Sequence, residues 1–333
     1  MKILITGGAG YIGSTIASAL EDSGHVPVLL DSLVNGRIEF TRNRIFYQGD
    51  IADAKLLARI FSENIDITCA IHCAALVNVA DSVNSPYNYY KENVAKSIEL
   101  FKNLHGVGCI NIVFSSSASV YDDVPNFMVT ESSPLNPRSP YASTKYMVEV
   151  VLRDFCQAHG MRSIALRYFN PIGADMKMRS GIYARNPSHV LGKLVSVALG
   201  REQVFKITGV DWETRDGSGV RDYIHVWDLA IAHVKAVENI HKIFQMVDNS
   251  FAVLNLGTGK GVTVFELVEA FERVYGKVVK KEIALARPGD VAGAYANAET
   301  ALKLIGWRAE KSIDEGIADA LKWDLLRETI IKP

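Results

Sequence analysis

Short β-rich runs alternate with helical patterns through the first half of the chain, and this alternation constrains the fold more than any other feature. The expected strands are Lys2–Thr6, Val26–Asp31, Arg44–Gln48, Ile67–His72, Ile110–Ser116 and Ser163–Tyr168. The helical patterns between them lie near Ile12–Ser23, Ala52–Glu63, Pro86–Leu104 and Pro140–His159. Alternating β and α units of this size form a parallel sheet with helices on both faces. We therefore predict an α/β fold with a doubly wound parallel sheet in residues 1–168.

After Tyr168 the alternation loosens, which predicts a second, smaller region. Phe169–Arg185 is rich in Gly, Pro and charged residues and is expected to be a long loop. Further helical patterns lie near 189–200, 227–241, 298–305 and 313–326, and a strand near 252–256 precedes a glycine-rich turn and a helix from Thr263. Thr263 and Glu266 have capping-box spacing. We expect 169–333 to form an α+β domain, with segments around 220–256 packing back on the first domain and a ligand bound in the cleft between them.

The turn after the first expected strand carries a glycine motif, Thr6-Gly7-Gly8-Ala9-Gly10-Tyr11-Ile12-Gly13. Glycines at 7, 10 and 13 allow a tight turn, close approach of the backbone to a pyrophosphate, and close packing of helix on strand. The helix N-terminus then offers N–H groups and the positive end of its dipole to the phosphates. With a strand before it and a helix after it, the motif predicts a Rossmann-type dinucleotide site.

Two aspartates follow neighbouring strands of the expected sheet. Asp31 ends the second strand, where a carboxylate accepts hydrogen bonds from ribose hydroxyls and repels a 2′-phosphate. It favours NAD over NADP, although Arg37 lies nearby. Asp50 follows the third strand, and its spacing leaves two interpretations open: a contact with the adenine amino group, or an N-cap for the helix expected from Ala52.

Tyr141 and Lys145 lie one turn apart at the start of the helix expected over 140–159. Ser139 is placed to cap this helix, and Pro140 suits its first turn. An ammonium near a phenol favours the phenolate and lowers the phenol pKa, which makes the tyrosine a candidate general base for an alcohol proton. The pair alone equally fits a half-buried tyrosine beside a solvated lysine.

Composition excludes several classes of function. The formal net charge is −1, so nothing draws the chain to nucleic acid or to an anionic membrane. No signal peptide and no apolar run of membrane-spanning length is recognisable, and we expect a cytoplasmic protein. Of the four cysteines, Cys69, Cys73 and Cys109 lie in or beside apolar runs and are expected to be buried free thiols. The clustered spacing of a zinc site is absent, so no metal is expected.

Further segments carry a resemblance to a known family. With Ser117, the glycine motif and the Tyr-x-x-x-Lys pair resemble the extended short-chain dehydrogenase/reductases. The chain is also similar to the UDP-glucose 4-epimerases, from residue 1 to about Trp323, in segments that occur in the same order as in that family. They are Asp31–Gly36, Phe114–Tyr121, Leu166–Ala174, Gly219–Val226 and Arg287–Asp290.

The resemblance implies a role for each matching residue. Tyr141 is the base, Ser117 binds the sugar 4-hydroxyl, and Lys145 lowers the tyrosine pKa and holds the nicotinamide ribose. The cofactor implied is NAD, and its implied contacts are Gly7, Gly10, Tyr11, Ile12, Gly13, Asp31, Ser32, Asn35, Gly36, Asp50, Ile51, Cys73, Ala74, Ala75, Asn93, Ser115, Tyr141, Lys145, Tyr168 and Phe169. The implied substrate contacts are Ser117, Asn170, His189, Val190, Lys206, Ile207, Thr208, Arg221, Tyr223, Arg287, Asp290 and Ala294. From the residues alone, two arginines suit a diphosphate, but surface ion pairs with Asp222 or Asp290 are the simpler interpretation.

The sequence departs from the family pattern at several places. Val77 replaces a lysine near the cofactor phosphates, which removes a charge contact. Ser188-His189-Val190 replaces an Asn-Asn-Leu run that contacts the substrate phosphates, and the loop Asp175–Arg185 differs in composition. Ala294 falls where family members carry a residue that limits sugar size. Its small side chain leaves room for a 2-acetamido group.

The resemblance implies NAD-dependent 4-epimerisation of UDP-glucose and UDP-galactose, extended by the alanine to UDP-N-acetylhexosamines. Two alternatives stay open at this point. A UDP-glucuronate 4-epimerase would use the basic loop Lys177–Arg185 to hold a carboxylate, and a catalytically silent NAD-binding regulator would use the fold alone. A 4,6-dehydratase is disfavoured, because Ala118 and Ser119 cannot supply its acid/base pair. The family also implies a homodimer, with Pro86–Leu104 and Pro140–His159 as the candidate interface helices.

Overall fold

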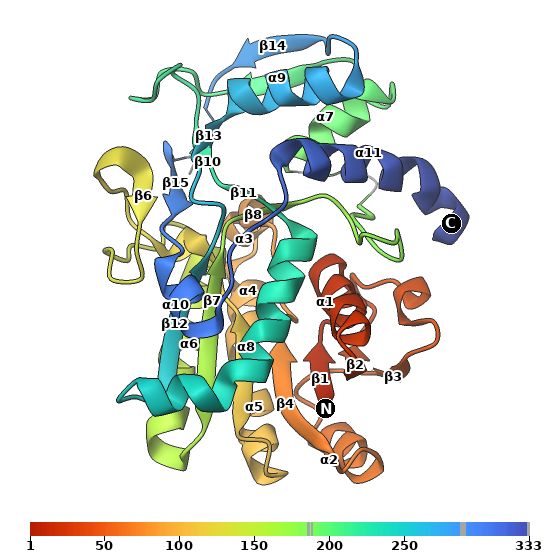
Figure 1. Ribbon diagram of the computed structural model, residues 1–333, viewed down its shortest axis with the longest axis vertical. Coiled ribbons are helices and arrows are strands. Elements are labelled where there is room, and N and C mark those ends of the chain that lie inside the picture. The colour runs from red at the N-terminus through yellow and green to blue at the C-terminus, as the bar shows by residue number, and fades with distance from the viewer. Residues whose placement is uncertain (185–186, 188, 287–290, 332–333) are drawn as a thin grey trace.

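A seven-stranded parallel sheet forms the central layer of the computed structural model, which describes residues 1–184, 187, 189–286 and 291–331 (Figure 1). Its strands are β1 (Lys2–Thr6), β2 (Val26–Asp31), β3 (Ile45–Gln48), β4 (Ile67–His72), β5 (Asn111–Ser115), β7 (Arg162–Tyr168) and β12 (Phe251–Leu256). The order across the sheet is β12-β7-β5-β4-β1-β2-β3, and every neighbouring pair is parallel. The predicted doubly wound parallel sheet is confirmed.

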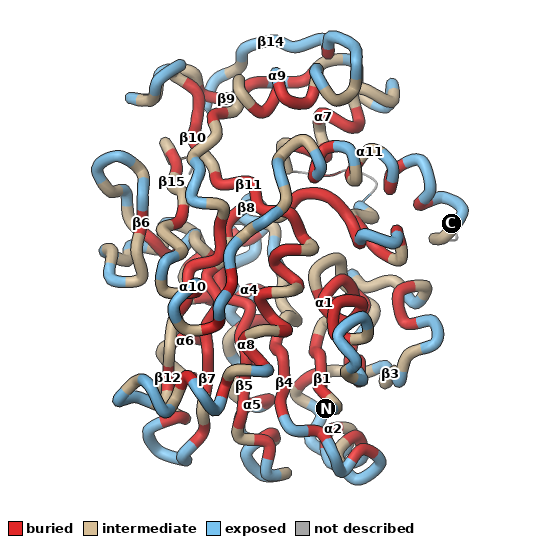
Figure 2. Tube along the Cα trace, in the orientation of Figure 1, coloured by how far each residue is buried: buried red, intermediate tan, exposed pale blue. Residues whose placement is uncertain are grey.

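Helices cover both faces of this sheet, because successive side chains of each strand point to opposite sides. Ile3 and Ile5 pack with α1 (Tyr11–Asp22), α8 (Val226–Met246) and α10 (Glu299–Ile305). Leu4, between them, belongs to a second core with α2 (Ala54–Glu63), α5 (Lys96–Gly106) and α6 (Pro140–His159). Figure 2 shows the strands as the most continuously buried part of the chain.

The helix expected over Pro86–Leu104 is not a single α-helix. The chain forms α3 (Val79–Asn84), α4 (Pro86–Tyr89), a π-helical segment (Tyr90–Ala95) and only then α5. Such π-helical segments are frequent at functional sites. Here the segment carries the buried Asn93.

The second half of the chain contributes to both regions. β12 extends the central sheet beyond β7, and α8 lies along α1. The remaining strands form small sheets above it, drawn at the top of Figure 1: β13-β10-β15-β6, β11-β8 and β14-β9. They are β6 (Met128–Val129), β8 (Asn170–Ile172), β9 (Phe205–Thr208), β10 (Val220–Arg221), β11 (Tyr223–His225), β13 (Val262–Thr263), β14 (Lys281–Ala284) and β15 (Gly293–Ala296). The division into domains at residues 168 and 169 stays a prediction.

Helix caps follow the local sequence. Ser139 accepts a hydrogen bond from Ala142 N at the start of α6, and Thr263 with Glu266 forms a capping box on α9 (Val264–Tyr275). Two further helices, α7 (Val190–Ala198) and α11 (Ile313–Ile330), complete the upper region. The stretch expected to be a long loop from Phe169 contains strand β8, which pairs with β11. Within the described residues, no helix combines the length and apolarity needed to cross a bilayer.

Candidate active site

The glycine turn between β1 and α1 is packed so closely that side chains cannot be added to it. Gly7 has φ +71°, and a Cβ there would lie 2.7 Å from Ala74 N. A Cβ on Gly13 would lie 2.2 Å from the Gly7 carbonyl oxygen. Gly10 is the N-cap of α1 and supplies no side-chain cap, so the first N–H groups of the helix remain for an anion. The cradle fits the pyrophosphate of a dinucleotide.

The predicted cofactor residues lie after the carboxyl ends of adjacent parallel strands, the edge at which such sheets bind ligands. Ser32, Asn35 and Gly36 follow β2, Asp50 and Ile51 follow β3, Cys73, Ala74 and Ala75 follow β4, Ser115 ends β5, and Tyr168 with Phe169 ends β7. Tyr11 and Ile12 begin α1, where the Tyr11 hydroxyl donates to the Gly173 carbonyl.

Asp31 is buried at the end of β2 and accepts backbone hydrogen bonds from Ala9 N (3.0 Å) and Leu33 N (2.8 Å). The carboxylate thus ties the glycine turn to the loop after β2. Tyr183 approaches the same place from the distant 175–184 loop, and its ring lies 5.2 Å from the Arg37 guanidinium. Burial and, to a smaller extent, the nearby Asp31 charge raise the pKa of Tyr183 to about 12, against a lowering by Arg37. The sequence analysis did not identify Tyr183, which no local pattern links to Asp31.

Asp50 and Asn93 hold loops around the site. Asp50 does not cap α2: Asp53 does, accepting from Lys55 N and Leu56 N, so that interpretation was wrong. Asp50 instead accepts from Ala52 N and pairs with Lys96 at 2.5 Å. The Asn93 amide accepts from Leu76 N and donates to Leu76 O and to Thr144 Oγ1, which joins the loop after β4 to α6. Its predicted cofactor role stays a prediction.

Tyr141, Ser117 and Lys145 come together at the carboxyl end of β5. The Ser117 side chain lies close enough to the Tyr141 phenol to lower its pKa, and Ser117 Oγ accepts hydrogen bonds from Ser119 N (3.2 Å) and Ser119 Oγ (2.9 Å). The Lys145 ammonium donates to the Ser115 carbonyl (2.9 Å) and lies 5.9 Å from the centre of the Tyr141 ring. Both Tyr141 and Lys145 are buried, so the solvated-lysine interpretation of the pair is wrong.

The pKa of the tyrosine differs from the expectation. Burial raises the pKa of Tyr141 to about 12, against a lowering by the neighbouring Ser117 side chain. Burial also lowers the pKa of Lys145 to about 8, opposed by Cys73 and Glu149. The protein groups around Tyr141 therefore do not by themselves bring its pKa towards neutrality, because desolvation outweighs them.

A second polar layer lies behind these residues. Ser115 Oγ is hydrogen-bonded to His233 Nε2 (2.9 Å) and to Cys73 Sγ (3.1 Å). His233 Nδ1 lies 2.8 Å from the Leu229 carbonyl and donates to it, so its Nε2 accepts from Ser115. Cys69 and Cys109 are buried free thiols as expected, whereas Cys73 is half-buried at this edge.

The predicted substrate residues gather on the short strands above the sheet. Asn170 pairs with Tyr223 across β8 and β11, and Arg221 pairs with Ala294 across β10 and β15. The Arg221 guanidinium donates to the carbonyls of Val291 and Ala292, and no ion pair with Asp222 is found among the described residues, whereas an ion pair with Asp290 is not tested. Arg287 and Asp290 lie outside the described residues.

The hydroxyl of Tyr223 is buried and has no hydrogen-bond partner within the described part of the chain. A buried hydroxyl normally has a partner, so this one is available to a ligand beside Arg221. Lys206, Ile207 and Thr208 form β9, where Lys206 is exposed and faces Glu282. If β9 contacts the nucleobase of the substrate, the contact would be made by its main-chain N–H and C=O groups, because the Lys206 charge faces Glu282.

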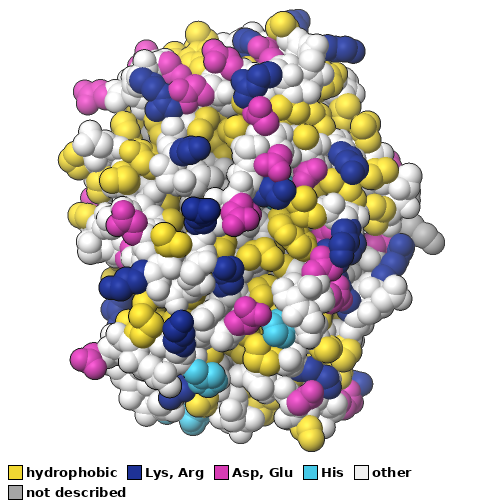
Figure 3. Space-filling view, viewed as in Figure 1, with side chains coloured by type: hydrophobic (Ala, Val, Ile, Leu, Met, Phe, Trp, Pro, Cys, Tyr) yellow, Lys and Arg dark blue, Asp and Glu magenta, His cyan; other side chains and the backbone are white. Residues whose placement is uncertain are grey.

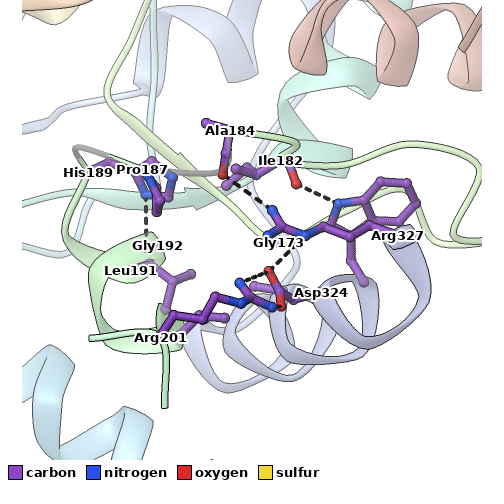
Figure 4. Close-up of a pocket in the computed structure, with 13 residues that line it drawn as sticks. Gly173, Ile182, Ala184, Pro187, His189, Leu191, Gly192, Arg201, Asp324 and Arg327 are labelled. Carbon is purple, nitrogen blue, oxygen red and sulfur yellow. Dashed lines mark hydrogen bonds and ion pairs between the residues drawn. The ribbon is translucent and has the colours of Figure 1, made fainter. Parts of the chain in front are cut away.

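His189 begins α7 as its N-cap, and its Nδ1 accepts from Gly192 N (3.1 Å), with Val190 following as the first helical residue (Figure 4). The ring lines a cavity of about 20 Å³ that Arg201, Asp324 and Arg327 close from the other side. A cavity of this size holds about one water molecule. The Nε2 atom of His189 is buried and has no hydrogen-bond partner among residues 1–184, 187, 189–286 and 291–331. The predicted substrate contact of His189 stays a prediction.

The described cations of the 175–184 loop are engaged by carboxylates. Lys177 pairs with Asp22 at the end of α1, and Arg179 pairs with both Asp22 and the buried Asp175. Arg179 also lies over the Trp227 ring. The face in Figure 3 shows positive and negative side chains interspersed, without a large field of one sign.

The comparisons with known proteins agree with this geometry. Residues 3–248 match the model of the NAD dependent epimerase/dehydratase family. The chain is 40% identical to a UDP-glucose 4-epimerase of Bacillus subtilis, over 97% of this chain and 96% of that protein. The solved UDP-glucose 4-epimerase of Bifidobacterium longum in complex with NAD+ and UDP superposes with a TM-score of 0.90 at 35% identity, covering 98% of each chain. A UDP-N-acetylglucosamine 4-epimerase from Methanobrevibacter ruminantium gives 0.84 at 29%, also covering 98% of each.

Proposed function

The chain belongs to the NAD dependent epimerase/dehydratase family, and from this premise we infer that it is a UDP-glucose 4-epimerase-like isomerase. It epimerises carbon 4 of UDP-sugars through a transient 4-keto sugar, with NAD as cofactor. The observation that carries the proposal is the grouping of the buried Tyr141 and Ser117, with Lys145 one turn away, at the sheet edge that also holds the glycine turn.

The site residues divide the work of proton transfer. Ser117 is placed to bind the 4-hydroxyl, and Tyr141 takes the proton of that hydroxyl and later returns it. Lys145 contributes a positive charge beside the phenol. When bound, NAD accepts the hydride of carbon 4 and returns it to the opposite face. Because the cycle has no net redox change, the cofactor must stay bound between turnovers.

Ionisation of Tyr141 requires more positive charge than the chain supplies. With a pKa of about 12 for Tyr141 and about 8 for Lys145, the phenol is neutral and the ammonium charged at pH 7. A further positive charge, such as that of oxidised nicotinamide, favours the phenolate. The acidic limb of the pH–rate profile of the holoenzyme is expected to report this lowered pKa of Tyr141.

The proposal is tested by mass spectrometry of the purified protein for retained NAD, followed by assays of UDP-galactose, UDP-N-acetylgalactosamine and UDP-glucuronate. Tyr141→Phe is expected to abolish epimerisation while NAD remains bound. Unchanged turnover in that variant would overturn the assignment. NAD binding without epimerisation of any of these sugars would instead favour the silent regulator.

The sugar range is proposed to include UDP-N-acetylhexosamines. Ala294 packs beside Tyr121 and Phe169, near the chain that leaves Ser117. Its methyl group leaves space for a 2-acetamido substituent. Ala294→Tyr is expected to lower activity on UDP-N-acetylgalactosamine relative to UDP-galactose. A constant ratio of the two activities would show that Ala294 does not limit the pocket.

The uronate alternative receives no support from the described loop. Lys177 and Arg179 are paired with Asp22 and Asp175, at the far end of α1 from the glycine turn. A C6 carboxylate would have to displace these partners. Direct comparison of UDP-glucuronate with UDP-galactose decides between the two substrates.

A cytoplasmic homodimer is the proposed working form. Tyr87, Tyr90 and Met147 are large exposed apolar side chains on the two candidate interface segments, and Tyr87 is 73% exposed. Pairing these segments between two copies would cover them. Light scattering of the purified protein measures the assembly, and a monomer that keeps full activity would contradict this part of the proposal.

A further inference from the structure

One face of α6 contacts three consecutive serines at the end of β5. Tyr141, Lys145 and Glu149 recur every four residues and so lie on one side of the helix. Tyr141 lies beside Ser117, Lys145 donates to the Ser115 carbonyl, and Ser116 Oγ donates to Glu149 Oε1 at 2.5 Å. The first two contacts belong to the proposed catalytic group, whereas the third has no part in the reaction described above.

Glu149 is fully buried and belongs to an ion pair. Arg167 on β7, itself 2% exposed, donates to both carboxylate oxygens, through Nε (2.9 Å) and Nη2 (2.6 Å). The carboxylate thus accepts three hydrogen bonds. Because β7 is the neighbour of β5, the pair joins the helix, the serine segment and the adjacent strand.

The network continues to the other side of Ser117. Arg167 Nη1 donates to the Tyr121 hydroxyl (3.1 Å), and the Tyr121 ring lies 4.9 Å from the guanidinium. The Tyr121 hydroxyl in turn donates to Asn255 on β12 (2.6 Å). The chain on both sides of Ser117 is therefore attached to the same arginine–glutamate pair.

A buried ion pair is not in itself a device for stability. Replacing such a pair by apolar residues of similar volume is often neutral or stabilising, because desolvation of the charges offsets their attraction. The location of this pair is more informative than its energy, because the Glu149 carboxylate accepts a hydrogen bond from Ser116, the residue that precedes Ser117.

We propose that Glu149 and Arg167 are positioning residues that hold Ser117 against Tyr141 and keep a negative charge one turn from Lys145. The inference rests on the proposed epimerase function. Glu149 touches neither substrate nor reacting atoms, so its effect should reach the reaction through the placement of Ser117 and the charge of Lys145.

The charge of Lys145 depends on several neighbours besides Glu149. The titratable groups that interact with it or lie beside it are Tyr141, His72 and Cys73. Of the two groups that favour its protonated form, Cys73 and Glu149, only Glu149 is a carboxylate, and it is paired with Arg167. Removing that charge should therefore let Lys145 lose its proton at lower pH.

The first test is Glu149→Gln in the holoenzyme. The loss expected in kcat is about 10- to 100-fold, since small misplacements of reacting groups have effects of this size. KM for UDP-galactose should stay within about threefold, because no substrate contact is removed. The alkaline limb of the kcat profile should move to lower pH. Wild-type kcat and an unmoved profile would overturn the inference.

Two further variants keep the test decisive if Glu149→Gln does not fold. Ser116→Ala leaves the ion pair intact and should lower kcat by about threefold or more. The double replacement Glu149→Met with Arg167→Met should keep or raise the melting temperature and still lose kcat. Wild-type kcat in either folded variant would overturn the proposal. Leu152→Ala, a buried change on the same helix, controls for lost stability and should leave the pH profile unmoved.

The position of Ser117 provides a readout that does not depend on activity. A crystal structure of Ser116→Ala or of the double variant should show a longer distance between the Ser117 and Tyr141 hydroxyls than in the wild type. A wild type that epimerises no UDP-sugar would refute the proposed function, and the crystallographic comparison would still decide the positioning role. Undisplaced hydroxyls in the variants would refute the positioning role.

Discussion

Replacing Asp222 with asparagine should destabilise the region around the proposed substrate site. Asp222 is fully buried and accepts four hydrogen bonds. One oxygen receives Thr258 N (2.8 Å) and Thr258 Oγ1 (2.7 Å), and the other receives Gly259 N (3.2 Å) and Ala296 N (3.1 Å). The carboxylate thus joins the chain between Arg221 and Tyr223 to the turn after β12 and to the end of β15.

An amide has one accepting oxygen, so at least one backbone N–H must face the new NH2 group. An orphaned buried donor costs about 1–3 kcal/mol, and loss of charge assistance weakens the remaining bonds, for a total of about 2–4 kcal/mol. For a chain of 333 residues this corresponds to a fall in melting temperature of about 3–6 °C.

Asp228→Asn is the matched control, measured by the same thermal melt. Asp228 is also buried, but Glu310 N and Lys311 N both donate to its single oxygen Oδ2. An asparagine carbonyl can keep both bonds, so the expected fall is about 1–2 °C. If Asp222→Asn melts no lower than Asp228→Asn, the bond-by-bond reasoning is refuted. KM for UDP-galactose should rise only in Asp222→Asn.

Two further predictions concern pH and the cofactor. Burial lowers the pKa of His72 to about 3 and of His189 and His233 to about 4. These groups are protonated in the unfolded chain below about pH 6.5 but not in the folded one, so the melting temperature should fall between pH 6.5 and 4, and a flat curve would contradict this. Gly13→Ala should weaken NAD binding about tenfold or more, because the new Cβ would overlap the Gly7 carbonyl. Gly106→Ala is the control, because its Cβ would meet no atom within 4 Å and NAD binding should not change. The amount of NAD retained by each purified variant measures the effect.

Local sequence was sufficient wherever the physical cause lies within a few residues. The alternation of β and α patterns predicted the central sheet, and the Ser139 and Thr263 caps were recognisable because a cap and its N–H partners are three residues apart. The glycine turn was readable for the same reason. Its tight geometry depends on backbone freedom at single positions.

Other features depend on residues far apart in the chain, and no local pattern encodes them. The ion pair of Asp50 with Lys96 joins residues that lie 46 positions apart, so no local pattern predicts it. From the sequence, Lys177 and Arg179 were candidates to bind a ligand, but in the folded chain both are paired with Asp22.

The sequence by itself therefore determined the sheet, the dinucleotide turn and the identity of the Tyr–Lys pair. Tertiary structure decided the electrostatics: burial, which depends on the whole fold, raises the pKa of Tyr141 where the spacing to Lys145 predicted a fall. It also decided which carboxylates meet which cations. The pairing of Glu149 with Arg167 exists only because α6 packs on the face of the sheet to which the Arg167 side chain of β7 points.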